Sequence, residues 1–335
     1  MGEKLIIRSS TADKHGDFIP LEQMKSYVET VNGEQKLRYL ANHRRDLPPL
    51  GFLDNAEIQQ KENVYHTLVE PIVFANRTEV DWDENLLCED SGQTVTFIKR
   101  DFDDLKKLRV TMDKNNFSSF DSYQQTGKRI AGVFGDEVEL KGSMRKNYLP
   151  DPQIVFTLAG YYAVLYPLIK PFLKKMGEKL AENITDDVYE LAKSTSKKMF
   201  SKIADTVRIA RTNLIPQNKA LLTIFEIPGE TDIELQVKSN DPNHIIKAIS
   251  EKQLFKMHQK VHELQSKVGI SEICFVFNLK CKWDFMYLIT KDGKVIGSKV
   301  AFKKRDRLME RINLSPTKAL SVGANGVEYV KIPKD

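Results

Sequence analysis

A long stretch without a charged side chain, residues 152–169, constrains the fold of this chain more than any other feature. Its sequence is PQIVFTLAGYYAVLYPLI, and basic residues flank it on both sides. A run of about 18 apolar residues is the lower limit for a helix that spans a membrane. The other interpretation is a helix buried in a protein core or interface, which we favour because Pro167 and Pro171 would kink a spanning helix near its end.

The residues that follow this run keep helical spacing. Apolar side chains recur at steps of three and four residues between 180 and 207, and basic residues outnumber acidic ones from 170 to 211. The pattern predicts a central helical hairpin that oligomerises or lies on an anionic membrane. The side chains expected to face a membrane or a partner helix are Ile154, Phe156, Leu158, Tyr161, Leu165, Leu168 and Phe172.

Folded domains are predicted on both sides of the hairpin. Before it, alternating strand patterns surround a short helix at 21–31. After it, the order strand–strand–helix–strand–strand–strand between 221 and 302 predicts an antiparallel sheet covered by a helix. We therefore predict an α+β protein in three parts: an α+β domain at 1–135, a linker and helical hairpin at 136–214, and an α+β antiparallel-sheet domain at 215–335.

The composition is that of an ordinary globular protein, with 41% hydrophobic and 29% charged residues. A net charge of +5 is too small to indicate nucleic-acid binding by itself. The acidic segment 79–90 is predicted to be a solvated loop. Three cysteines without CxxC spacing predict a reduced cytoplasmic protein, recruited to the inner face of the membrane if the central helices engage lipid. No cofactor or metal is predicted, since Gln259 stands where a zinc-protease helix needs Glu.

A histidine and a proline-rich turn follow the predicted strand at 36–42. The sequence there is NHRRDLPPLG, which begins at residue 42, so that His43 precedes the turn PPLG. With the upstream GDFIP and the short helix, this arrangement resembles the prohead (capsid maturation) serine proteases of tailed phages across residues 4–74. The resemblance implies a serine endopeptidase in which His43 is the catalytic imidazole. It also implies a role in phage biology or in bacterial defence against phages.

The nucleophile of such a protease would be a serine on a later strand. Ser118, in the sequence NNFSSFDS, is the candidate. The same residue also fits a helix N-cap, because Asp121 follows three positions later. Arg44 stands directly after His43, where the protease family usually has Asp, so that the fold could be shared without the protease chemistry.

Basic residues near the C-terminus lie close in sequence to aromatic ones. Trp283, Phe285 and Tyr287 alternate along a predicted strand and could form a stacking surface for bases, although aromatic residues in this pattern also fill cores. The basic residues predicted to rim that surface are Lys299, Lys303, Lys304, Arg305 and Arg307.

Three functions follow from these features. Our main prediction is a non-enzymatic interaction or effector protein, whose partner is a second copy of itself or another protein, with a membrane as a further partner. The first alternative is a serine endopeptidase that uses His43. The second is a nucleic-acid-binding protein that uses the C-terminal basic residues.

Overall fold

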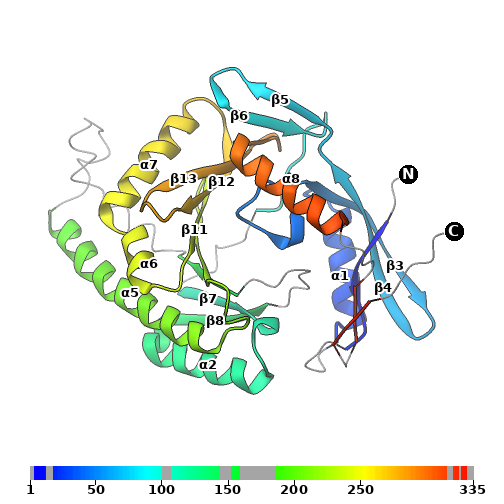
Figure 1. Ribbon diagram of the computed structural model, residues 1–335, viewed down its shortest axis with the longest axis horizontal. Helices are drawn as coiled ribbons and strands as arrows, with labels where there is room; N and C mark the ends of the chain where they lie inside the picture. Colours follow the sequence, from blue (N-terminus) through cyan, green and yellow to red (C-terminus); the bar gives the residue numbers. More distant parts are fainter. Residues whose placement is uncertain are drawn as a thin grey trace. The chain divides into compact units, whose positions relative to one another are not determined.

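The structure, a computed structural model, describes residues 4–12, 18–99, 107–143, 152–158, 186–314, 320–323 and 326–329 (Figure 1). The mixture of helices and strands confirms the predicted α+β class. The chain forms two compact units, of which one combines Met1–Lys99 with Met286–Asp335 and the other is Arg100–Phe285. These limits differ from the predicted three parts, because the segment from Met286 onward groups with the N-terminal elements.

A four-stranded antiparallel sheet, in the order β1–β4–β3–β2, forms the N-terminal part of the first unit. Its strands are β1 (Leu5–Ser9), β2 (Leu37–Tyr39), β3 (Gly51–Lys61) and β4 (Val64–Val73). The predicted helix is α1 (Leu21–Asn32), which packs on this sheet through Val31 against Leu53 and Val69. A Cβ atom on Gly51 would lie 1.8 Å from the carbonyl oxygen of Ile72, so only glycine allows β3 to begin so close to β4.

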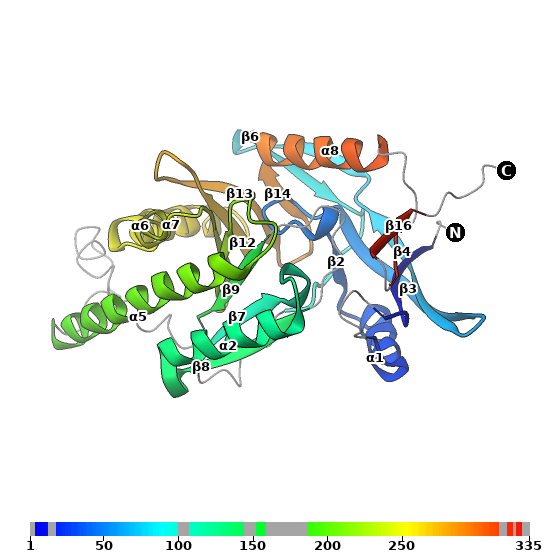
Figure 2. The ribbon, with the colours of Figure 1, turned by 60° about the horizontal axis from the view of Figure 1, so that its bottom comes forward.

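The first unit also contains a second antiparallel group of strands. Its order is β5 (Asn76–Val80), β6 (Asp83–Asp90), β14 (Val295–Ser298) and the residues of β13 (Trp283–Thr290) from Met286 onward. The helix α8 (Lys299–Leu314) lies against β6 and β14 (Figure 2). The prediction of a solvated loop at 79–90 is therefore wrong, because most of this acidic segment forms the β5–β6 hairpin. A small hairpin of β15 (Leu320–Gly323) and β16 (Gly326–Tyr329) follows α8.

The second unit is built from three parallel strand pairs, each connected through helix. The pairs are β7 (Leu108–Asp113) with β8 (Val138–Ser143), β9 (Gln153–Thr157) with β10 (Leu222–Ile227), and β11 (Asp232–Lys238) with β12 (Ile270–Phe277). Neighbouring pairs meet in antiparallel contacts, in the order β12–β11–β10–β9–β7–β8. The predicted purely antiparallel C-terminal sheet is therefore wrong, since parallel neighbours such as β11 and β12 require a crossover.

The helices of the second unit lie along one side of its strands (Figure 1). They are α2 (Phe120–Phe134), α5 (Asp186–Asn213), α6 (Pro242–Ala248) and α7 (Glu251–Gln265). On one face of the sheet, Phe156 and Phe225 stack at 5.6 Å between ring centroids. The opposite face carries buried polar side chains, where Thr157 Oγ1 donates a hydrogen bond of 2.6 Å to Glu226 Oε2.

The uncharged run begins as a strand. All residues of β9 are buried, and so is Leu158, which places Ile154 and Phe156 in the sheet of the second unit. The prediction that these three residues belong to a membrane or partner helix is therefore wrong. A strand buried on both faces reads as a continuous apolar run, which periodicity alone does not distinguish from a helix. The other predicted contact residues, Tyr161, Leu165, Leu168 and Phe172, lie outside the described residues.

The second half of the predicted hairpin contains a helix, as the amphipathic pattern indicated. Helix α5 runs from Asp186 to Asn213, and its side chains Ile203 and Val207 are fully buried. Strand β8 occupies part of the segment 136–150, which was predicted to be a linker. Across the ranges that the structure describes, no helix combines the length and the apolar character that a membrane crossing requires.

Candidate functional site

His43 lies in a short turn between β2 and β3. The turn is a 3-10 segment, Ala41–His43, in which His43 has a left-handed φ of 54° and an exposed side chain. The following turn PPLG is buried, and its Pro49 carbonyl accepts a hydrogen bond of 2.7 Å from Arg305 Nη1. This turn therefore serves as a docking point for the C-terminal helix α8.

Ser118 is exposed and lies just before α2. The N-cap of that helix is the next residue, Ser119, whose side chain accepts a hydrogen bond of 3.1 Å from the backbone N–H of Ser122. The prediction of a cap at Ser118 is therefore wrong by one position. His43 belongs to the first unit and Ser118 to the second, so the catalytic pairing of these two residues stays a prediction.

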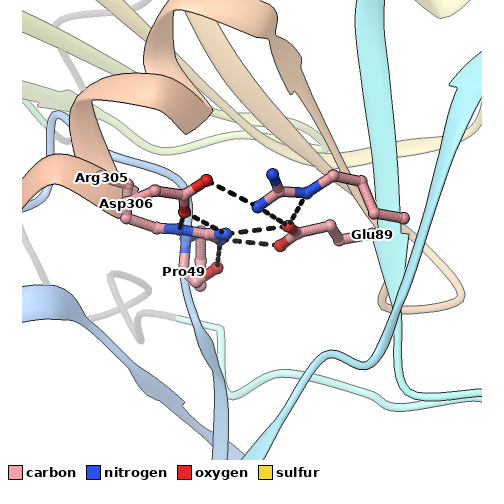
Figure 3. A network of polar contacts seen from close by, with 5 residues as sticks. Pro49, Glu89, Arg305 and Asp306 are labelled. Atoms are coloured by element: carbon pink, nitrogen blue, oxygen red, sulfur yellow. Dashed lines mark hydrogen bonds and ion pairs between the residues drawn. The ribbon is translucent and has the colours of Figure 1, made fainter. Parts of the chain in front are cut away.

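Helix α8 carries an arginine in the middle of its buried face. The Arg305 side chain is only 4% exposed, and it meets the equally buried Glu89 of β6. Its Nη1 donates to Glu89 Oε2 at 2.7 Å and its Nη2 donates to Oε1 at 2.8 Å (Figure 3). Such a two-pronged pair has a specific geometry, so it restrains the rotation of α8 about its own axis together with the buried apolar side chains of the helix. The prediction that Arg305 lies on a nucleic-acid surface is therefore wrong.

A second arginine and a second carboxylate complete this network. Arg77 of β5 donates to Glu89 from Nε at 2.7 Å and to Asp306 from Nη2 at 2.9 Å. Burial alone would lower the pKa of Arg77, but the hydrogen bonds to these two carboxylates outweigh burial and raise it. The guanidinium groups of Arg77 and Arg305 lie 5.3 and 4.9 Å from the centroid of the Phe302 ring. Two cations and two anions thus balance each other beneath α8.

The exposed face of α8 has a different charge balance. The basic side chains on this face are Lys299, Lys303, Lys304, Arg307 and Arg311. The acidic side chains beside them are the exposed Glu310 and the partly exposed Asp306, which pairs with Arg77. Lys299 Nζ lies 2.6 Å from Glu79 Oε1. For the other four, no carboxylate partner is found within the described ranges. We call this set of five basic side chains the α8 basic face.

A groove of about 360 Å³ runs beside this face. Lys299, Lys303 and Arg307 line it together with Arg77. The three residues of α8 lie one helical turn apart, so their charges form a row along the helix. The groove also contains Asp306 and Glu310, which makes its inner wall less basic than the outer surface of the helix.

Four of the five basic residues predicted from the sequence therefore lie together, and Arg311 joins them. The aromatic residues predicted beside them do not form an exposed surface. Tyr287 is fully buried, and its hydroxyl donates a hydrogen bond of 3.0 Å to the Arg45 carbonyl in the first unit. Trp283 and Phe285 are half-buried and belong to the second unit. No local pattern pointed to Glu89 and Arg77, because their role depends on contacts with residues far away in the chain.

Comparison of the sequence with protein-family models, and with curated proteins and solved structures, gives no match. The resemblance to prohead proteases therefore stays a prediction. Among the described residues, no group of three or more histidine, cysteine, aspartate or glutamate side chains is arranged to hold a metal ion. The α8 basic face is therefore the candidate site, because its exposed basic side chains lie together on one side of a single helix.

Proposed function

We propose that this chain is a non-enzymatic binding protein that holds nucleic acid by its phosphate backbone, and that the α8 basic face makes the contact. The supporting observation is that Lys303, Lys304, Arg307 and Arg311 gather on one helix face, without carboxylate partners in the part of the chain that the structure describes. Basic side chains that are already paired with carboxylates would attract a phosphate only weakly. The charges beneath the helix are already paired, so this outer face is the part of α8 that remains available.

Phosphate contacts give affinity without reading sequence. Each lysine or arginine that meets a phosphate releases condensed counterions, and this release drives binding at low salt. Contacts to the backbone position a protein on nucleic acid but carry no sequence information. We therefore expect binding with little sequence preference and a strong dependence on salt concentration.

The structure favours the nucleic-acid alternative over the interaction through central helices, which was our main prediction from the sequence. The interaction through central helices depended on residues 152–173, of which the first form the buried strand β9. The proposed function is still a non-enzymatic one, but the proposed partner is now nucleic acid, a polyanion. The α8 basic face lies in the first unit, so the proposal needs nothing from the central segment.

The test is a titration of fluorescently labelled single-stranded and double-stranded oligonucleotides, followed by anisotropy at several salt concentrations. The variant Lys303→Gln/Lys304→Gln/Arg307→Gln should bind more weakly and reduce the salt slope by about one unit for each phosphate contact that is lost. The matched control is Lys128→Gln/Arg129→Gln/Lys197→Gln, which removes the same charge from exposed positions of α2 and α5. It should keep most of the affinity.

Equal losses in the two triple variants would show that net charge alone is responsible, and would contradict the proposal. The proposal also fails if neither form of nucleic acid binds at low salt. Binding to anionic lipid vesicles without binding to oligonucleotides would move the α8 basic face from nucleic acid to a membrane surface.

A further inference from the structure

A pocket beside α7 in the second unit combines lysine side chains with an indole ring. Its volume is about 220 Å³. Lys256 and Lys260 lie one turn apart on α7, and Lys282 and Trp283 stand at the beginning of β13. No carboxylate is among the described residues that line it. Lys260 is partly neutralised by Glu263 at 2.7 Å, whereas no carboxylate partner of Lys256 or Lys282 is found in the described ranges.

A buried amide at this pocket has an unused acceptor. The side chain of Gln253 is 7% exposed, and its Nε2 donates a hydrogen bond of 2.9 Å to the Cys281 carbonyl. Its Oε1 has no hydrogen-bond donor within the described part of the chain. A buried acceptor without a donor is costly, so most such groups in folded proteins are paired. A ligand that carries an N–H or O–H group would supply the missing donor.

The turn that leads into Trp283 is held in place by its own hydrogen bonds. Asn278 Oδ1 accepts from the Lys282 backbone N–H at 3.1 Å, and Asn278 Nδ2 donates to Asp284 at 2.9 Å. The indole Nε1 donates to the Ala248 carbonyl at 3.2 Å. The backbone of Lys282 and the indole ring of Trp283 therefore have fixed positions before any ligand arrives, which lowers the entropy that binding costs.

We propose that this pocket binds a nucleoside phosphate. The phosphate lies among Lys256, Lys260 and Lys282, since lysine binds phosphate as a point charge. The base lies against the indole ring of Trp283, because stacking on an aromatic side chain stabilises any base. The Gln253 Oε1 accepts a hydrogen bond from an amino or hydroxyl group of the same ligand. The nucleotide can be free or can belong to a single strand, because both offer the same chemistry.

The pocket contains one of the two tryptophans of the chain, which allows a direct test. In the variant Trp82→Phe, fluorescence reports on Trp283 alone. This variant is titrated with AMP, with a short single-stranded oligonucleotide, with adenosine and with inorganic phosphate. We expect saturable quenching by the nucleotide or by the oligonucleotide, and weaker binding of adenosine and of phosphate. If AMP saturates the site, the ligand is a free nucleotide; if only the oligonucleotide does so, the ligand is a strand.

Two further variants test the roles of the residues in the Trp82→Phe background. Lys256→Gln/Lys282→Gln and, separately, Gln253→Leu should each weaken binding by roughly tenfold, about the effect of one good polar contact. The two lysines are exposed, so their variant should keep its fold. Lys128→Gln/Arg129→Gln is the control of equal charge and should bind like the parent.

The site is independent of the α8 basic face, and the two proposals can fail separately. The α8 triple variant should leave the quenching by AMP unchanged. Absence of quenching by all four ligands overturns the inference, and so does phosphate binding as tight as that of the nucleotide. Equal losses in the pocket variant and in its control would also overturn it.

Discussion

The guanidinium group of Arg305 and the carboxylate of Glu89 form a buried two-pronged ion pair between residues 216 positions apart in the chain. This pair joins the C-terminal helix to the β5–β6 hairpin, and the Pro49 carbonyl ties the same arginine to the turn before β3. Three segments of the first unit therefore meet at one side chain (Figure 3).

Replacing Arg305 by alanine should destabilise the first unit. Removing one partner leaves Glu89 buried with Arg77 alone, and breaking a buried pair costs about 3–5 kcal/mol. Because Arg77 still compensates part of the charge, we expect a loss near the lower limit. The measurement is urea unfolding followed by Trp82 fluorescence in a Trp283→Phe background. Arg311→Ala, on the exposed side of the same helix, should change stability by no more than about 0.5 kcal/mol. Similar losses in both variants would contradict the central role of the pair.

Gly51→Ala should destabilise the same unit by several kcal/mol, since the new Cβ would overlap the Ile72 carbonyl oxygen and force β3 and β4 apart. For Gly132→Ala we expect the opposite effect on stability. That glycine lies inside α2, and a methyl group added there would meet no neighbouring side chain or other segment within 4 Å, so alanine should stabilise the helix by about 0.5–1 kcal/mol. Thermal unfolding of the two variants, compared with the parent, checks both signs. A stable Gly51→Ala protein would show that the strands can separate without cost.

Removing the hydrogen bond between Thr157 and Glu226 tests whether β9 lies beside β10 in the sheet. Thr157→Val keeps the shape of the side chain but removes the donor to a buried carboxylate, which should cost about 1.5–3 kcal/mol. Thr157→Ser keeps the hydroxyl and should lose less. Urea unfolding of the Trp82→Phe background, in which Trp283 is the fluorescent reporter, measures the difference. A valine variant as stable as the serine variant would mean that this hydrogen bond contributes nothing.

Asp90 should make the β5–β6 hairpin sensitive to acid. The side chain of Asn76 and the backbone N–H of Gly92 donate to its Oδ1 at 2.9 and 2.8 Å, and they lower the pKa of this carboxyl below its ordinary value. A carboxylate whose pKa is lower in the folded state stabilises the protein above the pKa of the unfolded state. The stabilisation disappears as the pH falls through the folded pKa.

Asp90→Asn should therefore be less stable than the parent at about pH 7, and the difference should become smaller at about pH 2, as protonation removes the charge of Asp90. The difference will be small, because water screens an exposed side chain. Asn76→Ala removes the same hydrogen bond and should behave in the same way. Urea midpoints at the two pH values provide the measurement, and a difference that does not depend on pH would contradict the assignment.

Local patterns were enough to predict the α+β class and many of the elements. The β3–β4 hairpin follows from strand patterns around a polar turn, and α5 follows from its amphipathic stripe. Helix α8 was missed because the strand pattern of β14 was extended to residue 302. The helix begins after Ser298, whose hydroxyl accepts a hydrogen bond of 3.2 Å from the Ala301 backbone N–H, so an N-cap signal was present.

The candidate sites were harder to predict, and the reason is physical. Arg305 looks like its neighbours Lys303 and Lys304 in the sequence, and only the position of Glu89 makes it a buried residue. The strand β9 looks like a helix because both of its faces are buried. The amide of Gln253 becomes informative only when its partners are known. Contacts across long sequence distances decided each of these cases.

The division of the first unit between the two ends of the chain has a consequence for its synthesis. Strand β6 needs β14 as its neighbour, so the N-terminal segment leaves the ribosome well before its partner exists. At translation rates of about 5–20 residues per second, the wait lasts on the order of ten to forty seconds. During that interval the edge of β6 is uncovered, and an uncovered strand edge invites pairing with other chains. The nascent protein should therefore depend on chaperones more than its final stability would suggest.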